Sequence, residues 1–484
     1  MSDGKRPLRV LVSADTFPPD INGASRFAER LVGGLARRGN DVHVIAPGYN
    51  KKWGSSFETI DGSRVMVHRL KSYKLPQHET LRWVWPFTLR GRISKLLDRI
   101  QPDVIHINSH LITGRFLISA AKRRGVRTVS TNHIMPENLV KYSVIIPPFL
   151  EQWAMNLAWK DAGRILRKVD QLTTPTRRAA ELLEAAAGVN NVLAISCGID
   201  ASKFANDAPT TNEHPRILYL GRLDYEKHIH NLLKAVALLP KELGTVVELV
   251  GDGGERENLK QLARDLRIYE QVIFAGHISE ADLPKAYERC TVFAMPSIAE
   301  LQSIATMEAM ASGRPVVAAD AMALPHLVHD GDNGYLFAPD DVEDFAKKLQ
   351  IVLTANQKEL DRLSENSLHL IQAHDIQRTL GIFEQIYRGE YNFGDPTSDD
   401  NAPEYSQPIG SLSRGYHNQV EALRKRAKAL RELADDLRDN VREQLDEARE
   451  EVLETVDEIR AGAKKLDKKV RKTVKKATDK LKRD

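Results

Sequence analysis

The sequence predicts an α/β fold in which two Rossmann-like domains face each other across a cleft, followed by a long amphipathic helical tail. Three observations predict this arrangement. Short apolar runs alternate with helical segments, the alternation restarts after Pro215, and a segment rich in Gly, Pro, Ser and Asp precedes a strongly charged end. We place the domains at residues 1–196 and 197–390, a linker at 391–413 and the tail at 414–484.

The first half has the pattern of a parallel sheet covered by helices. A helix is predicted over residues 25–38, because apolar side chains recur there every three or four positions and Gly39 follows as a stop signal. The short apolar runs predict strands at residues 8–13, 41–46, 104–107, 127–131, 172–174 and 192–195.

The second half repeats this pattern from its beginning. A strand at residues 217–220, a turn at Gly221 and a helix at residues 231–239 open it. We expect its last helix to pack back on the first domain. Ligands of open α/β sheets bind beyond the carboxyl ends of the strands, so we expect the active site in the cleft. Further strands are predicted at residues 246–250, 272–275, 292–295 and 316–318.

The composition excludes several classes of protein. Hydrophobic residues make up 42% and charged residues 28% of the 484 residues, which is typical of a folded globular chain. Cys197 and Cys290 lie far apart, so neither a disulfide framework nor a zinc site is indicated, and a reducing cytoplasm is expected. No signal peptide and no apolar run long enough to span a bilayer are evident, so we expect any membrane contact to be peripheral.

The segment at residues 296–320 carries the strongest chemical signal. A predicted strand ends there, a short loop holds Glu300, and a helix beginning near Ser303 holds Glu308. Backbone N–H groups at a helix start bind phosphate oxygens, and carboxylates accept hydrogen bonds from sugar hydroxyls. The segment can therefore bind both parts of a nucleotide sugar. The alternative is a solvated pair of glutamates on a helix surface.

The residues around these two glutamates resemble a known family. Glu300, seven residues, Glu308 and then Ala-Met-Ala-Ser-Gly-Arg-Pro resemble the E-x7-E signature of family 4 retaining glycosyltransferases, which have the GT-B fold. The resemblance implies that Glu300 binds hydroxyls of the donor sugar, that Glu308 binds the ribose, and that the donor also contacts Ser303 and Ile304. The family usually has a Phe-Gly pair after the first Glu, where this chain has Leu301, Gln302 and Ser303.

A second segment, at residues 218–236, resembles the G-R-L-x-x-E-K-G segment of the same family. It places Arg222 and Lys227 after a strand, where they are candidates for binding the diphosphate and for catalysis. Fixed cations stabilise a leaving diphosphate more in the transition state than in the ground state, and they can replace a metal. The alternative is a pair of surface charges. His228 stands where the family commonly has Gly.

Three further residues complete the predicted site. Gly23 lies in the loop after the first strand, where it permits close approach of the donor. His133 follows a strand that ends at Thr131, and the resemblance implies a catalytic-site histidine there, although a lone His is more often structural. His277 lies in a segment that resembles the family's nucleotide-base loop. We predict no metal site and no cofactor besides the sugar nucleotide.

Two segments of the first domain are rich in aromatic and aliphatic residues. They span residues 81–87 and 142–159, and either contact the membrane interface or pack in the core. Lipid-modifying bacterial members of the family resemble this chain in having such segments. That resemblance favours a lipid acceptor such as diacylglycerol or a phosphatidylinositol derivative.

The predicted tail has apolar residues at steps of three and four that form an eleven-residue repeat, which indicates a long straight helix. Residues 461–484 contain eleven Lys or Arg and three Asp, a local balance of 11 − 3 = +8. Such an end can anchor to anionic lipid at the membrane. Equally, the tail can form a homo-oligomeric coil through its acidic middle and basic end.

The sequence therefore predicts a retaining hexosyltransferase that uses UDP-glucose or GDP-mannose at the cytoplasmic face of the plasma membrane. Two alternatives stay open: a glycosyltransferase with a soluble acceptor, and a non-catalytic scaffold assembled through the tail. The four charged candidates Arg222, Lys227, Glu300 and Glu308 argue against the scaffold. Nucleic acid is not an expected partner, because the basic end lacks aromatic residues for base stacking.

Overall fold

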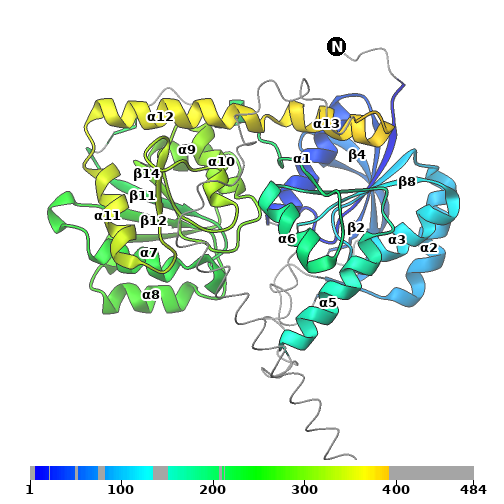
Figure 1. Ribbon diagram of the computed structural model, residues 1–484, viewed down its shortest axis with the longest axis horizontal. Helices are drawn as coiled ribbons and strands as arrows, with labels where there is room; N and C mark the ends of the chain where they lie inside the picture. Colours follow the sequence, from blue (N-terminus) through cyan, green and yellow to red (C-terminus); the bar gives the residue numbers. More distant parts are fainter. Residues whose placement is uncertain are drawn as a thin grey trace, which may run out of the picture. The chain divides into compact units, whose positions relative to one another are not determined.

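The computed structural model describes residues 6–20, 22–49, 53–74, 82–133, 151–205, 210–211 and 213–391. Two large sheets lie in this part of the chain, within one compact unit (Figure 1). The predicted tail lies outside the described residues, as does the predicted linker after Tyr391. The α/β prediction with two Rossmann-like domains is confirmed.

The first sheet has eight strands in the order β10-β9-β8-β7-β1-β2-β4-β3. All neighbouring strands are parallel except the pair formed by the edge strand β3 with β4. The strands are β1 (Arg9–Ser13), β2 (Asp41–Pro47), β3 (Gly54–Ile60), β4 (Ser63–Leu70), β7 (Val104–Ile107), β8 (Arg127–Thr131), β9 (Gln171–Thr174) and β10 (Leu193–Ala194).

Strands β3 and β4 were not predicted from the sequence. Strand β3 is polar and almost wholly exposed, because it forms the edge of the sheet, so it lacks the buried apolar run of a central strand. Asp61 and Gly62 connect β3 to β4 in a tight hairpin. An Asp-Gly pair of this kind is the sequence signal that could have predicted the hairpin. A second, two-stranded hairpin pairs β5 (Ser72–Lys74) with β6 (Arg82–Val84).

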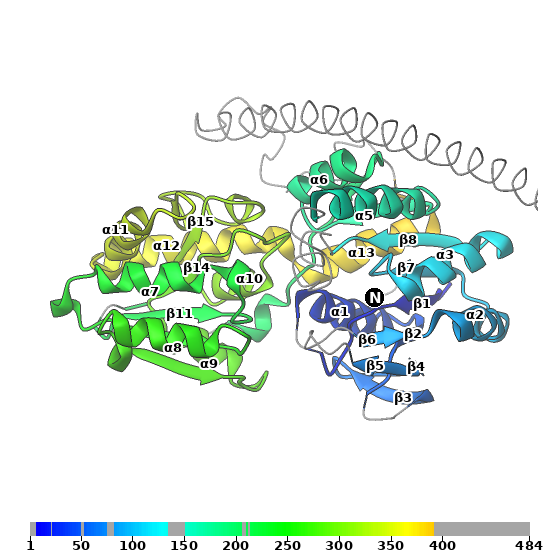
Figure 2. The same ribbon diagram turned by 90° about the horizontal axis from the view of Figure 1, so that it is seen from below.

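The first sheet is covered by helices that connect its parallel strands along the sequence. Helix α1 begins where the Asn22 side chain accepts a hydrogen bond from Ser25 N, 2.9 Å away. It buries Phe27 and Leu31 against the sheet. Helices α5 and α6 pack side by side (Figure 2). The helices are α1 (Gly23–Arg37), α2 (Pro86–Ile100), α3 (Ile112–Arg124), α5 (Glu151–Leu166) and α6 (Arg177–Ala187).

The second sheet has six parallel strands in the order β13-β12-β11-β14-β15-β16. They are β11 (Arg216–Leu220), β12 (Val246–Val250), β13 (Val272–Gly276), β14 (Val292–Met295), β15 (Val316–Ala319) and β16 (Gly334–Phe337). The helices of this part are α7 (Ile229–Ala237), α8 (Arg256–Asp265), α9 (Leu283–Glu288), α10 (Ile304–Ala311), α11 (Val342–Leu353) and α12 (Gln357–Ile371).

The last described helix, α13 (Ile376–Arg388), contacts the first sheet and α1. Arg127 Nε of β8 donates to the Ile386 carbonyl at 2.8 Å, and the Phe383 and Phe27 rings lie 5.9 Å apart. Gly34 of α1 makes room for α13, because a Cβ there would lie 2.5 Å from a methyl carbon of Leu380. The chain therefore passes twice between the two sheets.

Candidate active site

A cavity of about 410 Å³ opens between the two domains, and its walls come from both. This volume lies within the range of small-molecule sites. All eight residues predicted to bind the donor line it: Gly23, Arg222, Lys227, His277, Glu300, Ser303, Ile304 and Glu308. The structure thus brings together segments that lie far apart in the sequence.

Lys227 and Glu300 form an ion pair on the cavity wall. Lys227 Nζ donates to Glu300 Oε1 at 2.6 Å, and the side chains are 17% and 13% exposed. Lys227 ends a short 3₁₀ turn after β11, and Glu300 lies in the loop between β14 and α10. Because both groups are largely shielded from water, their charges interact more strongly than those of a surface pair.

Arg222 lies beside them, with its guanidinium held by two acidic neighbours. It donates to Asp224 and, at 3.0 Å, to Glu226 Oε1. The Tyr219 hydroxyl donates to the Arg222 carbonyl oxygen at 2.8 Å, which fixes the turn after β11. Burial, followed by the charge of Glu300, raises the pKa of Tyr219, so that this hydroxyl keeps its proton. The guanidinium is therefore oriented before any ligand binds.

Glu308 is a buried residue of α10, which excludes the alternative of a solvated surface pair. Its side chain is 2% exposed and accepts hydrogen bonds from Arg30 Nη2 at 2.7 Å and the Tyr287 hydroxyl at 3.0 Å. Burial and the Glu308 carboxylate raise the pKa of Tyr287, so that its hydroxyl stays a donor. Since Arg30 belongs to α1 of the first domain, this ion pair crosses the cleft.

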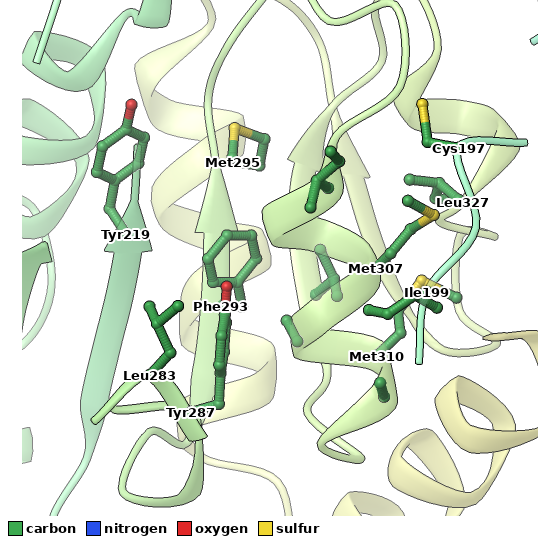
Figure 3. Close-up of a cluster of buried hydrophobic side chains, with 14 of the residues drawn as sticks. Cys197, Ile199, Tyr219, Leu283, Tyr287, Phe293, Met295, Met307, Met310 and Leu327 are labelled. Carbon is green, nitrogen blue, oxygen red and sulfur yellow. The ribbon is translucent and has the colours of Figure 1, made fainter. Parts of the chain in front are cut away.

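Helix α10 begins at the cavity wall and rests on a buried apolar cluster. Ser303 caps it, with Oγ accepting from Thr306 N at 3.3 Å. Met307 and Met310 of this helix are buried beneath the site (Figure 3). The apolar support holds the start of α10 at a constant position relative to Glu300.

Gln302 stands where the family commonly has another residue. Its side chain connects the loop before α10 to the segment that joins the two domains. Its Oε1 accepts from Cys197 N at 2.7 Å, and its Nε2 donates to Ser196 Oγ at 3.1 Å. A glycine there would make neither contact. The departure therefore has a structural role at the cleft.

Two glycines shape the cavity wall, one by leaving open space and the other by allowing two loops to pack closely. At Gly23 a Cβ would meet nothing within 4 Å, so the first turn of α1 faces open space. At Gly251 a Cβ would lie 1.9 Å from the Gly221 carbonyl oxygen, which no side chain permits. The loops after β11 and β12 are thus packed backbone to backbone on the cavity wall.

His133 is the one predicted catalytic residue that does not line this cavity. Its ring packs on Phe27, with 4.6 Å between the centroids. Burial lowers its pKa to about 4, so the imidazole is neutral at pH 7. Its Nε2 atom is buried and has no hydrogen-bond partner among the described residues.

His228, the departure from the family's Gly, adopts the left-handed conformation with φ of 50°. This conformation explains why glycine is common at that position. The strain is offset by a contact of its Nδ1 with Asp340 Oδ1 at 2.9 Å. The turn therefore keeps its shape, and Lys227 remains on the cavity wall.

Several residues that sequence reasoning missed also shape the cavity. Arg26 Nη1 donates to Glu280 Oε1 across the cleft at 2.7 Å, and Glu29 lines the wall beside them. Burial, followed by the charge of Glu280, raises the pKa of Glu29. No local motif marks these residues or Arg30, because their partners belong to the other domain.

Comparison with known proteins identifies the family. The model for Glycosyltransferase Family 4 matches residues 21–203, and the model for Glycosyl transferases group 1 matches residues 200–369. A GDP-mannose-dependent alpha-mannosyltransferase of Mycolicibacterium smegmatis is 30% identical over 350 residues, covering 69% of this chain and 86% of the relative. The chain belongs to glycosyltransferase family 4.

Other relatives of this glycosyltransferase are named for different activities. An alpha-monoglucosyldiacylglycerol synthase of Streptococcus pneumoniae is 24% identical over 402 residues, covering 78% of this chain and 85% of the relative. Among solved structures, sucrose-phosphate synthase of Thermosynechococcus elongatus matches with a TM-score of 0.66 and 21% identity, covering 79% of this chain and 99% of that one. The structural match shows the GT-B fold.

The enzyme is therefore a glycosyltransferase that uses nucleotide sugars, as the sequence predicted. In the part of the chain that the structure describes, no helix is long and apolar enough to cross a membrane. Nor do the described residues include three or more His, Cys, Asp or Glu side chains grouped to hold a metal ion.

Proposed function

We propose that this enzyme transfers a hexosyl group from a nucleoside diphosphate sugar to a membrane lipid, with retention at the anomeric carbon and without a metal ion. The observation that carries the proposal is the Lys227–Glu300 pair, 2.6 Å apart in a cavity that is also lined by Glu308 and the start of α10. Cations, carboxylates and helix-start N–H groups are the groups that recognise a diphosphate and a sugar.

Each charged group at the cavity has a separate role in the proposed reaction. As the bond between the anomeric carbon and the diphosphate breaks, negative charge accumulates on the leaving oxygen, and Lys227 and Arg222 stabilise it. Glu300 accepts hydrogen bonds from the sugar hydroxyls and orients the ring. The acceptor oxygen bonds to the anomeric carbon on the same face, and its proton passes to the diphosphate. This front-face route requires no protein nucleophile.

Binding of the ribose requires a rearrangement at Glu308. Its carboxylate is occupied by Arg30 and Tyr287, so ribose hydroxyls must replace at least one of these donors. The Arg30 contact is the one that crosses the cleft. Donor binding therefore exchanges an interdomain ion pair for contacts with the nucleotide.

For the donor, we favour GDP-mannose over UDP-glucose, on the likeness to the mycobacterial GDP-mannose-dependent relative. We expect donor turnover with GDP-mannose to exceed that with UDP-glucose, GDP-glucose and UDP-galactose. EDTA should leave the rate unchanged, because Lys227 and Arg222 supply the positive charge. The measurement is nucleoside diphosphate release with each donor, with and without EDTA.

Activity that disappears in EDTA and returns with Mg²⁺ or Mn²⁺ would contradict the metal-free mechanism. Faster turnover with UDP-glucose would assign the other donor and leave the rest of the proposal intact. A folded enzyme that turns over no sugar nucleotide would favour the scaffold alternative.

A lipid acceptor is supported by the exposed face of α5. Trp153 and Leu157 are 63% and 51% exposed, and they lie one turn apart on this helix. Lys160 and Arg164 continue the same exposed face. Exposed apolar side chains next to cations are typical of helices that lie in the membrane interface. We place the enzyme at the cytoplasmic face of the plasma membrane on this basis.

We expect the double variant Trp153→Ser with Leu157→Ser to lose most of its binding to vesicles of anionic phospholipid. The reason is the loss of the apolar contact area that these two side chains provide. Co-sedimentation with the vesicles measures the effect. Leu238→Ser is the matched control, because Leu238 is 55% exposed after α7 in the other domain.

A truncated chain that ends at Gly410 separates the contribution of the tail to vesicle binding from that of α5. Vesicle binding that is lost only on truncation would assign the anchor to the tail instead of α5. A lower mass in light scattering after truncation, with binding unaltered, would assign the tail to homo-oligomer formation. Unchanged binding in every variant would favour a soluble acceptor.

A further inference from the structure

Another cavity, of about 310 Å³, lies in the first domain on the side of the sheet opposite the donor. Its walls come from the amino ends of β1 and β2, from β3 and β4, and from the last residues of α2. The donor cavity lies beyond the carboxyl end of β1, where Pro18, Pro19 and Gly23 line it. Because β1 has five residues, roughly 15 Å of strand separates its two ends. No residue lines both cavities, so the second is a separate site.

Four polar side chains form a continuous series along this cavity: Ser55, His68, His43 and Asp41. We name them the histidine chain. Ser55 lies opposite His68 in the β3–β4 register, with 2.7 Å between Oγ and Nδ1. His68 Nε2 lies 3.1 Å from His43 Nδ1, and the two rings are parallel. At the far end, His43 Nε2 lies 3.4 Å from Asp41 Oδ1.

The carboxylate at this far end decides the direction of the hydrogen bonds in the histidine chain. A carboxylate only accepts, so His43 Nε2 carries the hydrogen that faces Asp41. A neutral His43 then accepts at Nδ1 from His68 Nε2, and His68 Nδ1 accepts from the Ser55 hydroxyl. Burial, followed by His43 and Arg99, lowers the pKa of His68 to about 4, and burial also lowers the pKa of His43. Both rings are therefore neutral at pH 7, and His68 Nδ1 can still take up a proton.

The charged groups that face the histidine chain leave the cavity positive. They are Arg9 of β1, Asp41 of β2 and Arg99 of α2, whereas β3 and β4 contribute no other charged side chain to the lining. Arg9 Nε donates to Asp41 Oδ2 at 2.7 Å, so these two charges offset each other. Within the described part of the chain, Arg99 has no hydrogen bond or ion pair. The guanidinium of Arg99 is thus available to an anion.

We propose that this cavity binds a phosphate group, and that each bound phosphate is accompanied by one proton taken up at His68 Nδ1. The proton reverses one hydrogen bond of the histidine chain: His68 Nδ1 donates to Ser55 Oγ, and the Ser55 hydroxyl hydrogen turns toward the phosphate. Arg99 and the imidazolium then supply two positive charges, which match a dianion, whereas a carboxylate matches only one. The volume is at the lower end of small-molecule sites, which leaves room for a small phosphate ester.

The first experiment titrates the full-length enzyme with sulfate, which stays a dianion between pH 6 and pH 8, so that a pH dependence of binding comes from the protein. Saturating GDP is present to occupy the donor cavity, where Arg222 and Lys227 also attract anions. Calorimetry in two buffers of different ionisation enthalpy counts the protons taken up. We expect uptake of about one proton at pH 6, and about tenfold tighter binding at pH 6 than at pH 8, because the bound anion raises the pKa of His68. Binding without proton uptake overturns the inference.

Arg99→Gln should weaken sulfate binding about tenfold or more, because it removes charge-assisted hydrogen bonds to the anion. Arg92→Gln is the matched control, since Arg92 is exposed on the same helix and does not line the cavity. It should bind sulfate with the affinity of the unaltered enzyme. Equal affinities in the two variants would show that sulfate is attracted by the general surface charge, and would overturn the site.

His68→Gln tests the proton. Its amide can still donate to His43, but it cannot take up a proton, so the proton uptake should disappear. Proton uptake that persists in this variant contradicts the role of His68. Because His68 is buried, Ser55→Ala on the exposed edge strand provides a second variant, and circular dichroism verifies both folds. It should weaken sulfate binding, since it removes the hydroxyl that turns toward the anion; unchanged binding would contradict the reversal.

Inorganic phosphate and glycerol 3-phosphate distinguish the two sources of a phosphate group. Tighter binding of glycerol 3-phosphate, weakened in Arg99→Gln, supports the site and assigns it to a phosphate ester. Equal or tighter binding of inorganic phosphate, with the same sensitivity, supports the site and assigns it to the free ion. Binding of neither compound overturns the inference. Each result is independent of the proposed function, because it is measured as binding and requires no transfer of a sugar.

Discussion

The variant Lys227→Ala is expected to lower kcat by about 100- to 1,000-fold, the range seen when one preorganised group that stabilises developing charge is removed. Lys227 Nζ already lies 2.6 Å from Glu300, and the side chain is only 17% exposed. In the variant, water therefore cannot readily supply the stabilisation that the positive charge of Lys227 gives to the leaving diphosphate. The measurement is steady-state transfer with saturating donor, together with circular dichroism to verify the fold.

Lys234→Ala is the control for this effect, because Lys234 is an exposed residue of the neighbouring helix α7. It should retain normal kcat. A Lys227→Ala enzyme that raises only KM would indicate that Lys227 binds the donor equally in the ground state and the transition state. In that case the assignment of Lys227 to leaving-group stabilisation would be wrong.

The variant Glu308→Gln should weaken binding of the free nucleotide by about 10- to 100-fold, because hydrogen bonds to a charged group contribute roughly 1.5–3 kcal/mol. We choose Gln because it keeps the shape of the side chain, and its one amide oxygen can still accept from either Arg30 or Tyr287, which contact different oxygens of Glu308. Glu300→Gln should instead lower the transfer rate with little change in nucleotide affinity. Calorimetry with GDP, combined with kcat, distinguishes the two.

Glu288→Gln is the matched control, since Glu288 is exposed at the end of α9. It should alter neither quantity. Unchanged GDP affinity in Glu308→Gln would remove Glu308 from the nucleotide site and leave the contact with Arg30 as its only role. Equal losses of nucleotide affinity in both Glu variants would show that the two carboxylates do not divide the donor as proposed.

Local sequence patterns predicted the central elements well. The strands at residues 104–107 and 292–295 have the predicted bounds, because a short run of buried apolar residues is a sufficient signal for a central parallel strand. Strand β3 was missed because an exposed edge strand needs no apolar run. The eight predicted donor residues line one cavity, although their roles stay predictions.

The sequence by itself determined the fold class and the family, and it predicted the donor residues, because all of these depend on short segments in which neighbours along the chain carry the chemistry. Only the tertiary structure decided which groups meet across the cleft. Arg30 pairs with Glu308, and the Gln302 side chain accepts a hydrogen bond from the backbone N of Cys197. In both contacts the two residues lie far apart in the sequence. Hydrogen bonds depend on distances of about 3 Å, which the packing of two sheets determines and no local pattern encodes.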